Sequence, residues 1–215
     1  MIKKLTLAVL AALFLSMSAG CGNGKQPDVI PENAAETGNA AEQENSGKED
    51  SAEAEKPKSR GFFEEFTAED LSGNPVTQDI FKDCDLTMIN IWATFCGPCI
   101  NEMPDLGELH NTWKEKGVQV VGLCTDTVNL DGTYIDENLE TAKLIVEETG
   151  ADYLHIIPSG EVAGRLLPQI QVVPTTVFVD KDGKQVTSAV TGSRKLEDWE
   201  KIITILLEEM EKAES

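Results

Sequence analysis

The chain has 215 residues and a formal net charge of −20 at pH 7, with 38 Asp and Glu residues against 18 Lys and Arg residues. A surface this acidic repels the phosphates of nucleic acids and the headgroups of anionic lipids, which argues against both as electrostatic partners. Most of the negative charge lies in residues 61–215, a length that suits one domain with an adequate hydrophobic core.

The first twenty residues have the pattern of a signal peptide. Two lysines precede an apolar stretch, Leu5–Met17, that is too short to cross a bilayer as a helix. Small residues then lead into Cys21, as in the lipobox of bacterial lipoproteins, although Ser18 stands where that pattern usually has Leu. We therefore predict a lipoprotein signal peptide over residues 1–20 and an acylated Cys21. Ordinary secretion, with Cys21 an incidental thiol, is the alternative.

Residues 22–60 are rich in Glu, Ala, Asn, Gly, Ser and Lys and contain no aromatic residue. Such a segment cannot bury enough apolar surface to offset its chain entropy. We predict that residues 21–60 are an acylated cysteine followed by a disordered acidic tether, and that residues 61–215 are the folded domain. A flexible coil of this length would hold the domain on the order of 35 Å from a membrane.

The folded part alternates strands and helices. The apolar run Leu86–Trp92 predicts a strand covered on both faces, and the unit from Leu86 to Cys124 reads as strand, helix, strand, which implies two parallel strands. The class is therefore α/β with a mixed sheet. In chain order, the other predicted elements are strands at Phe62–Phe66 and Val76–Thr77, a helix from Pro98 to Trp113, a strand at Val118–Leu123, a helix at Glu137–Thr149, a strand at Tyr153–Ile157, a short helix capped by Ser159, a hairpin of Thr175–Val179 and Gln185–Thr191, and a C-terminal helix capped by Ser193.

The motif Cys96-Gly97-Pro98-Cys99 follows the strand at Leu86–Trp92 and opens the next helix. This placement puts both sulfurs at a helix N-terminus, where unpaired N–H groups and the helix dipole stabilise a thiolate. A thiolate is the species that attacks a disulfide. Zinc sites use the same spacing but need two further ligands, and the other cysteines and the two histidines are isolated in the sequence. We therefore favour a redox dithiol and expect neither a metal nor a cofactor.

Three stretches together resemble the thioredoxin fold: the run from Trp92 to Cys99, Pro104, and Val173-Pro174-Thr175 before a hairpin. More narrowly they resemble the TlpA/ResA-like family of membrane-anchored bacterial thiol-disulfide oxidoreductases. Asn90, where thioredoxins usually carry a buried Asp, favours this branch, as do the N-terminal turn and the extra helix and strand at 137–157. The resemblance implies a mixed central sheet flanked by helices, with an N-terminal strand and turn extension and a helix–strand insertion before a cis-proline.

The resemblance also implies roles for individual residues. Cys96 is expected to be the exposed attacking thiol and Cys99 the buried resolving thiol. Pro174 is expected to be cis, although an ordinary proline at the start of a strand is the alternative. Glu102 matches an active-site glutamate of ResA-like members and is expected to take the proton of Cys99, unless it is a solvated surface residue. The residues expected to contact substrate are Trp92, Phe95, Gly97, Pro98 and Val173.

The remaining thiols and imidazoles are expected to stay outside the chemistry. Cys84 and Cys124 are predicted at opposite edges of the sheet, about 20 Å apart, whereas a disulfide needs Cα atoms within about 7 Å. Cys124 is either a small buried residue or a third redox thiol. His110 is expected to be an exposed helix residue, and His155 a strand residue without a catalytic role.

The resemblance implies an extracytoplasmic enzyme, lipid-anchored on the cell membrane, that is expected to reduce disulfides of exported proteins. The implied electron donor is a membrane thiol carrier of the CcdA or DsbD type, and apocytochrome c is one candidate substrate. Gly97-Pro98 is the dipeptide of thioredoxin, whose potential of about −270 mV is strongly reducing. Two alternatives are a peroxiredoxin-like peroxidase, whose Pro-x-x-x-Thr-x-x-Cys motif is missing here, and a Sco-like copper chaperone, which uses Cys-x-x-x-Cys and a later His.

Overall fold

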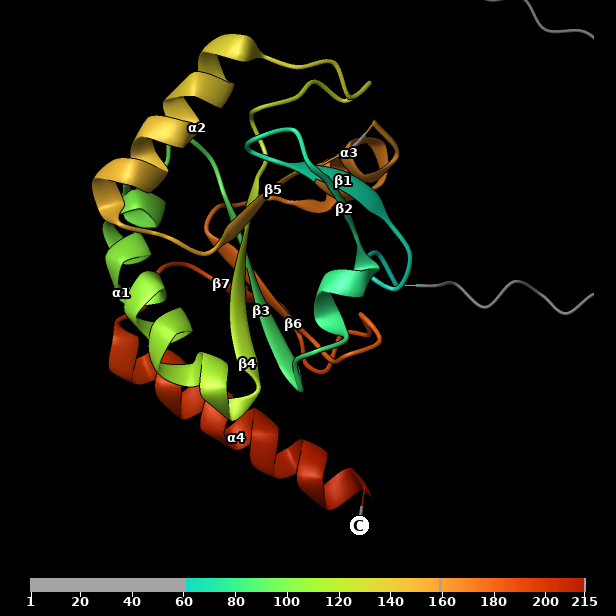
Figure 1. Ribbon diagram of the computed structural model, residues 1–215, viewed down its shortest axis with the longest axis vertical. Coiled ribbons are helices and arrows are strands. Elements are labelled where there is room, and N and C mark those ends of the chain that lie inside the picture. Colours follow the sequence, from blue (N-terminus) through green and yellow to red (C-terminus); the bar gives the residue numbers. More distant parts are fainter. Residues whose placement is uncertain (1–60, 159, 215) are drawn as a thin grey trace, which may run out of the picture. The chain divides into compact units, whose positions relative to one another are not determined.

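The computed structural model describes residues 61–158 and 160–214 (Figure 1). The predicted signal peptide, the acylated Cys21, the tether of residues 21–60 and the helix cap at Ser159 lie outside these residues. In the described ranges, every helix is too short or too polar to span a bilayer.

The fold is built on one mixed seven-stranded sheet, with strand order β2-β1-β5-β4-β3-β6-β7. The central strand β3 pairs in parallel with β4, which pairs in parallel with β5, and β3 pairs antiparallel with β6 on its other side. The expected α/β class with a mixed sheet is therefore confirmed. The strands are β1 (Thr67–Asp70), β2 (Pro75–Thr77), β3 (Leu86–Trp92), β4 (Val118–Cys124), β5 (Leu154–Pro158), β6 (Thr175–Val179) and β7 (Val190–Thr191).

Helices cover both faces of the sheet (Figure 1). Alternate residues of β3, such as Met88 and Trp92, join a core that includes residues of the helices α1, α2 and α4. The intervening residues, such as Ile89 and Ile91, join a second core with Phe81 of η1 and residues of α3. All seven residues of β3 are buried for this reason. The helices are α1 (Gly97–Trp113), α2 (Asp136–Thr149), α3 (Gly160–Leu166) and α4 (Leu196–Glu214), with short 3-10 turns η1 (Gln78–Phe81), η2 (Lys114–Lys116) and η3 (Leu167–Gln169).

Three predictions about individual elements are wrong: one strand, the length of another strand and one helix cap. Residues Phe62–Phe66 form turns instead of a strand, because Phe63 and Phe66 are buried by packing on the ring of Phe81 and on each other. The second strand of the C-terminal hairpin is shortened to Val190–Thr191, with one isolated bridge between Val179 and Gln185. The helix α4 begins at Leu196, whose N–H donates to the carboxylate of Asp105 on α1, so Ser193 is not its cap.

An aromatic cluster supports the strand ends next to the disulfide. In the register of β4 and β5, Gly122 lies opposite His155, and a Cβ at Gly122 would overlap the imidazole. This glycine makes room for His155, which stacks on Tyr153 at 4.4 Å and lies edge-on to Trp92 at 5.6 Å between ring centroids. Burial lowers the pKa of His155 to about 4, so the imidazole is neutral at pH 7.

Candidate active site

The predicted cysteine pair comes together as a disulfide between Cys96 and Cys99, with Cα atoms 5.3 Å apart. Cys96 is the N-cap residue of α1, and its Sγ accepts a hydrogen bond from the N–H of Cys99 at 3.2 Å. Pro98 occupies the first turn of the helix, where its missing N–H costs nothing. Both sulfurs therefore lie at the positive end of the helix dipole, which stabilises a thiolate on reduction.

Around the cysteine pair, Phe95, Gly97 and Pro98 form an exposed rim, whereas Trp92 is buried. Cys96 keeps 5% of its surface exposed and Cys99 none, so the expected order of accessibility holds. The expectation that Cys96 is exposed is wrong for this disulfide form, because Cys96 is buried. Phe95 is 78% exposed, and Gly97 and Pro98 are also exposed. Trp92 is completely buried. Its expected role in contacting substrate is therefore wrong, because the end of a strand covered on both faces cannot reach solvent.

The peptide bond between Val173 and Pro174 is cis, so that expectation is confirmed. The carbonyl of Pro174 accepts a hydrogen bond from the N–H of Gly192 at 2.8 Å, and Thr175 then enters β6 opposite Ile91 of β3. Because β3 and β6 are antiparallel, the start of β6 lies at the edge of the sheet where β3 leads into Cys96. Within the described residues, the backbone groups of Val173 have no hydrogen-bond partner.

Glu102 is buried, with 3% of its surface exposed, so the alternative of a solvated surface residue is wrong. Its Oε1 accepts a hydrogen bond from the amide of Asn90 at 3.0 Å, and its Oε2 accepts one from the backbone N–H of Arg194 at 3.0 Å. Asn90 is itself fully buried and also contacts the hydroxyl of Thr176 at 3.3 Å. Burial raises the pKa of Glu102, and the hydrogen bonds only partly oppose this effect. A carboxyl in this state can gain or lose a proton closer to neutral pH than an exposed one.

Asp126, which no sequence motif indicated, fixes the segment between β3 and Cys96. Its carboxylate accepts hydrogen bonds from the N–H of Thr94 at 3.0 Å and from the hydroxyl of Thr94 at 2.5 Å. The next residue back, Thr125, donates from its N–H and its hydroxyl to the carbonyl of Trp92. One signal in the sequence could have indicated this role. Asp126 lies just beyond the carboxyl end of β4, which is parallel to β3, and the carboxyl ends of parallel strands meet at one edge of a sheet.

The other two described cysteines are free and do not pair with each other, as predicted. Cys124 is fully buried, and its Sγ lies 3.4 Å from Oδ1 of Asp126. Burial, together with the negative charge of Asp126, raises the pKa of Cys124 well above its ordinary value. Cys84 is partly buried, and burial raises its pKa as well. Neither thiol has the environment of a reactive thiolate.

The two histidines serve the packing of the domain. His110 is only partly exposed, contrary to expectation, and its Nδ1 accepts a hydrogen bond from the N–H of Val120 at 3.1 Å. His155 is buried beside the carbonyl of Ala151, with Nε2 3.1 Å from that oxygen. Among the described residues, no group of three His, Cys, Asp or Glu side chains is placed to hold a metal ion.

We predict that Glu102→Gln changes how stability depends on pH. Because the folded-state pKa of Glu102 is raised above 4.5, the folded protein holds this proton more tightly than the unfolded chain. The resulting stabilisation is complete below the unfolded pKa and is lost as pH rises through the folded pKa. We therefore compare the free energy of unfolding of the variant with that of the wild type. The difference, variant minus wild type, should increase with pH above about 4.5 until Glu102 is ionised in the folded state.

Denaturant unfolding of the oxidised protein at a series of pH values measures this difference. Glu108→Gln is the matched control, because Glu108 lies on the same helix but is exposed. Its stability should follow the wild type at every pH. Parallel curves for wild type and Glu102→Gln would contradict the assignment of a raised pKa to Glu102.

We predict that Asp126→Asn weakens the segment before Cys96. The carboxylate contacts three donors, which are the N–H and the hydroxyl of Thr94 and the thiol of Cys124. An amide has one acceptor oxygen and no charge, so it cannot accept from all three. The variant should lose about 1–3 kcal/mol in free energy of unfolding, and its reduced Cys96 should react more slowly with iodoacetamide at neutral pH. Asp152→Asn, at an exposed position, is the control. Unchanged stability and unchanged Cys96 reactivity in Asp126→Asn would refute a positioning role.

Comparisons with known proteins place this site in a family. The model of the AhpC/TSA family matches residues 62–187, more than half of the chain. The thiol-disulfide oxidoreductase ResA of Bacillus thuringiensis subsp. konkukian is 31% identical over 144 residues, which cover 65% of this chain and 75% of the relative. The ResA of Oceanobacillus iheyensis is 35% identical over 118 residues, 53% of each chain.

Solved structures agree with this placement. The crystal structure of a thiol:disulfide interchange protein of the thioredoxin family from Chlorobium tepidum TLS matches with a TM-score of 0.53 and 26% identity, over 66% of this chain and 93% of that one. The mixed sheet with helices on both faces therefore has the thioredoxin fold of that protein. The chain belongs to the AhpC/TSA family in the thioredoxin-like superfamily, and within it to the TlpA/ResA-like thiol-disulfide oxidoreductases.

Proposed function

We propose that this thiol-disulfide oxidoreductase works outside the cytoplasm as a reductase of disulfides in exported proteins. The observation that carries the proposal is the Cys96–Cys99 disulfide at the N-terminus of α1, at the sheet edge that also holds the cis peptide before Pro174. A dithiol in this position has a stabilised attacking thiolate and, beside it, a free backbone at Val173 where an extended peptide can pair.

The first step forms a mixed disulfide. The Cys96 thiolate attacks one sulfur of the substrate disulfide, a bond forms between that sulfur and Cys96, and the other substrate sulfur leaves as a thiolate. We assign Val173 and the exposed rim of Phe95, Gly97 and Pro98 to substrate binding. Hydrogen bonds from the substrate strand to the Val173 backbone would hold the disulfide over Cys96.

The second step releases the substrate. Cys99 gives up its proton, for which Glu102 is the proposed acceptor, and attacks the sulfur of Cys96. The substrate sulfur bound to Cys96 leaves as a thiolate and takes up a proton. The protein is left with the Cys96–Cys99 disulfide, and the substrate has gained two electrons and two protons in all. Glu102→Gln should therefore slow this release more than the first attack, as seen by accumulation of the mixed disulfide.

Restoring the dithiol requires a reductant, for which we propose a membrane thiol carrier of the CcdA or DsbD type. The dithiol of the carrier would reduce the Cys96–Cys99 disulfide by the reverse exchange and become a disulfide itself. The signal-peptide pattern and Cys21 support attachment to the outer face of the cell membrane through an N-terminal lipid. Cys21→Ser should then shift the protein from the membrane fraction to the soluble fraction. Retention in the membrane would refute the lipid anchor.

A thiol peroxidase is the second candidate, because the matching family model is that of AhpC/TSA proteins. The site argues against it. The peroxidatic pattern would need a threonine three residues before Cys96, where this chain has Ala93, and the hydroxyl of the nearby Thr94 is bound to Asp126. Peroxide consumption by the reduced protein, at rates above those of a free thiol, would revive the peroxidase.

The reduction potential decides the direction of electron flow. We predict a value near that of thioredoxin, about −270 mV, because Gly97-Pro98 matches its active-site dipeptide. The measurement is equilibration in redox buffers, followed by acid quenching, alkylation and mass spectrometry of the Cys96–Cys99 peptide. Cys84→Ser should have the wild-type potential. A potential near −120 mV, the value of the oxidant DsbA, would refute the reductase.

A further inference from the structure

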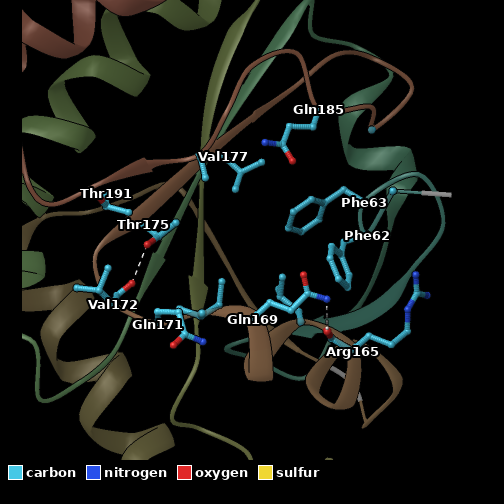
Figure 2. A pocket seen from close by; sticks show the side chains of 15 residues that line it. Phe62, Phe63, Arg165, Gln169, Gln171, Val172, Thr175, Val177, Gln185 and Thr191 are labelled. Carbon is cyan, nitrogen blue, oxygen red and sulfur yellow. Dashed lines mark hydrogen bonds between the residues drawn. The ribbon is translucent and has the colours of Figure 1, made fainter. Parts of the chain in front are cut away.

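A groove with a volume of about 850 Å³ runs along the sheet face opposite α1 (Figure 2). Its lining includes Thr175 and Val177 of β6 and Thr191 of β7. The loop of residues 169–172 and the turn at 61–63 also line it, and Figure 2 shows their side chains around the opening. This face of the sheet is therefore left partly open beside α3.

The lining has the chemistry of a peptide-binding surface. Val172 is 49% exposed, and Val177, Ile170 and Phe62 add further apolar surface. Among the described residues that line the groove, Arg165 is the one charged side chain, although the whole chain has 38 acidic residues. The groove therefore offers apolar contacts to a bound peptide, without the electrostatic repulsion that the acidic surface exerts on negatively charged groups.

Polar contacts for a main chain are also available in the groove. Three glutamines in the lining each donate from Nε2 to a backbone carbonyl, at 3.2, 3.3 and 2.6 Å for Gln169, Gln171 and Gln185. In the described part of the chain, their side-chain oxygens accept no hydrogen bond. These oxygens can accept hydrogen bonds from the N–H groups of an extended peptide.

The groove is bordered by the segment that leads into the cis peptide. Val172 lines the groove and is followed directly by Val173 and the cis peptide, and its carbonyl accepts a hydrogen bond from the hydroxyl of Thr175 at 2.7 Å. A substrate strand paired with the Val173 backbone advances about 3.3 Å per residue. Two or three residues beyond the attacked cysteine, it would lie over Gln171 and Val172 and enter the groove.

We propose that this groove binds an extended, apolar segment of the substrate polypeptide that flanks the cysteine attacked by Cys96. The inference rests on the proposed function and adds a substrate class to it: polypeptides in which the disulfide lies in an unfolded stretch with apolar or aromatic neighbours. Few folded proteins present an extended segment with exposed apolar side chains on both sides of a disulfide, so the enzyme would favour chains that have not yet folded.

The test uses the full-length, pre-reduced protein in single turnover with two peptides, each supplied as its symmetric disulfide dimer. One peptide carries Leu and Phe on both sides of its cysteine, and the other carries Ser and Asn at the same positions. Acid quenching, alkylation and mass spectrometry count the peptide thiols released. The apolar peptide should react roughly tenfold faster, the scale of one or two good side-chain contacts.

Variants locate the preference in the groove. Ala189→Trp places an indole in the lining, whereas Ser188→Trp adds the same bulk at an exposed neighbour outside it. The ratio of the two rates should fall toward one in Ala189→Trp and keep the wild-type value in Ser188→Trp. Gln169→Trp, which fills the groove from its other wall, should repeat the loss.

Each other outcome has a distinct meaning. Equal rates for the two peptides in the wild type, or a preference that survives both groove-filling variants, would overturn the groove proposal while leaving the reductase intact. Failure to reduce either peptide would refute the proposed function itself. A photoreactive group at position 189 that captures residues before Gly61 in place of the peptide would assign the groove to the chain itself, and would also overturn the proposal.

Discussion

Burying a carboxyl directly behind a redox disulfide is the constraint around which this domain is organised. An ionisable side chain out of contact with water is costly unless polar groups surround it. Here those groups come from distant parts of the chain, because Asn90 is on β3 and Arg194 precedes α4, and Asn90 is in turn bound to Thr176 on β6. The order of the strands and the docking of α4 therefore have to be correct before the Glu102 carboxyl has its hydrogen-bond partners. The hydrogen bonds of Glu102 to Asn90 and Arg194 therefore serve two purposes: they hold the carboxyl near the disulfide, and they join elements that pack in the core.

A second polar cluster, around Asp126, fixes the other side of the disulfide. It holds the short segment that leaves β3, so Cys96 enters α1 as the N-cap in a defined position. The two clusters act on different sulfurs: Asp126 positions the approach to Cys96, and Glu102 lies near Cys99. This division suits an exchange reaction in which one thiol attacks and the other resolves. It also explains why Cys124, which contacts Asp126, is kept as a protonated, buried thiol.

The sequence predicted those features that depend on local patterns. Nearly continuous apolar residues identified β3, and the Cys-x-x-Cys motif at a strand–helix junction identified the disulfide. The cis peptide before Pro174 was expected from the resemblance to the TlpA/ResA-like family and is confirmed. Features set by tertiary contacts were missed. The aromatic run at 62–66 looks like a strand, but its rings reach the core from turns. The start of α4 is fixed by Asp105, which is 91 residues away in the chain, so Ser193 was a misleading local signal. Nothing local distinguishes a buried Glu102 from an exposed glutamate.

Trapping the mixed disulfide tests the central claim most directly. In Cys99→Ser the first attack can still occur but the complex cannot resolve, so incubation of the reduced variant with disulfide-containing unfolded proteins should give a covalent complex. The account predicts that peptide mapping places this link at Cys96 alone and that a reductant dissolves it. The absence of a complex, or a link at Cys84 or Cys124, would contradict the assignment of Cys96 as the attacking thiol.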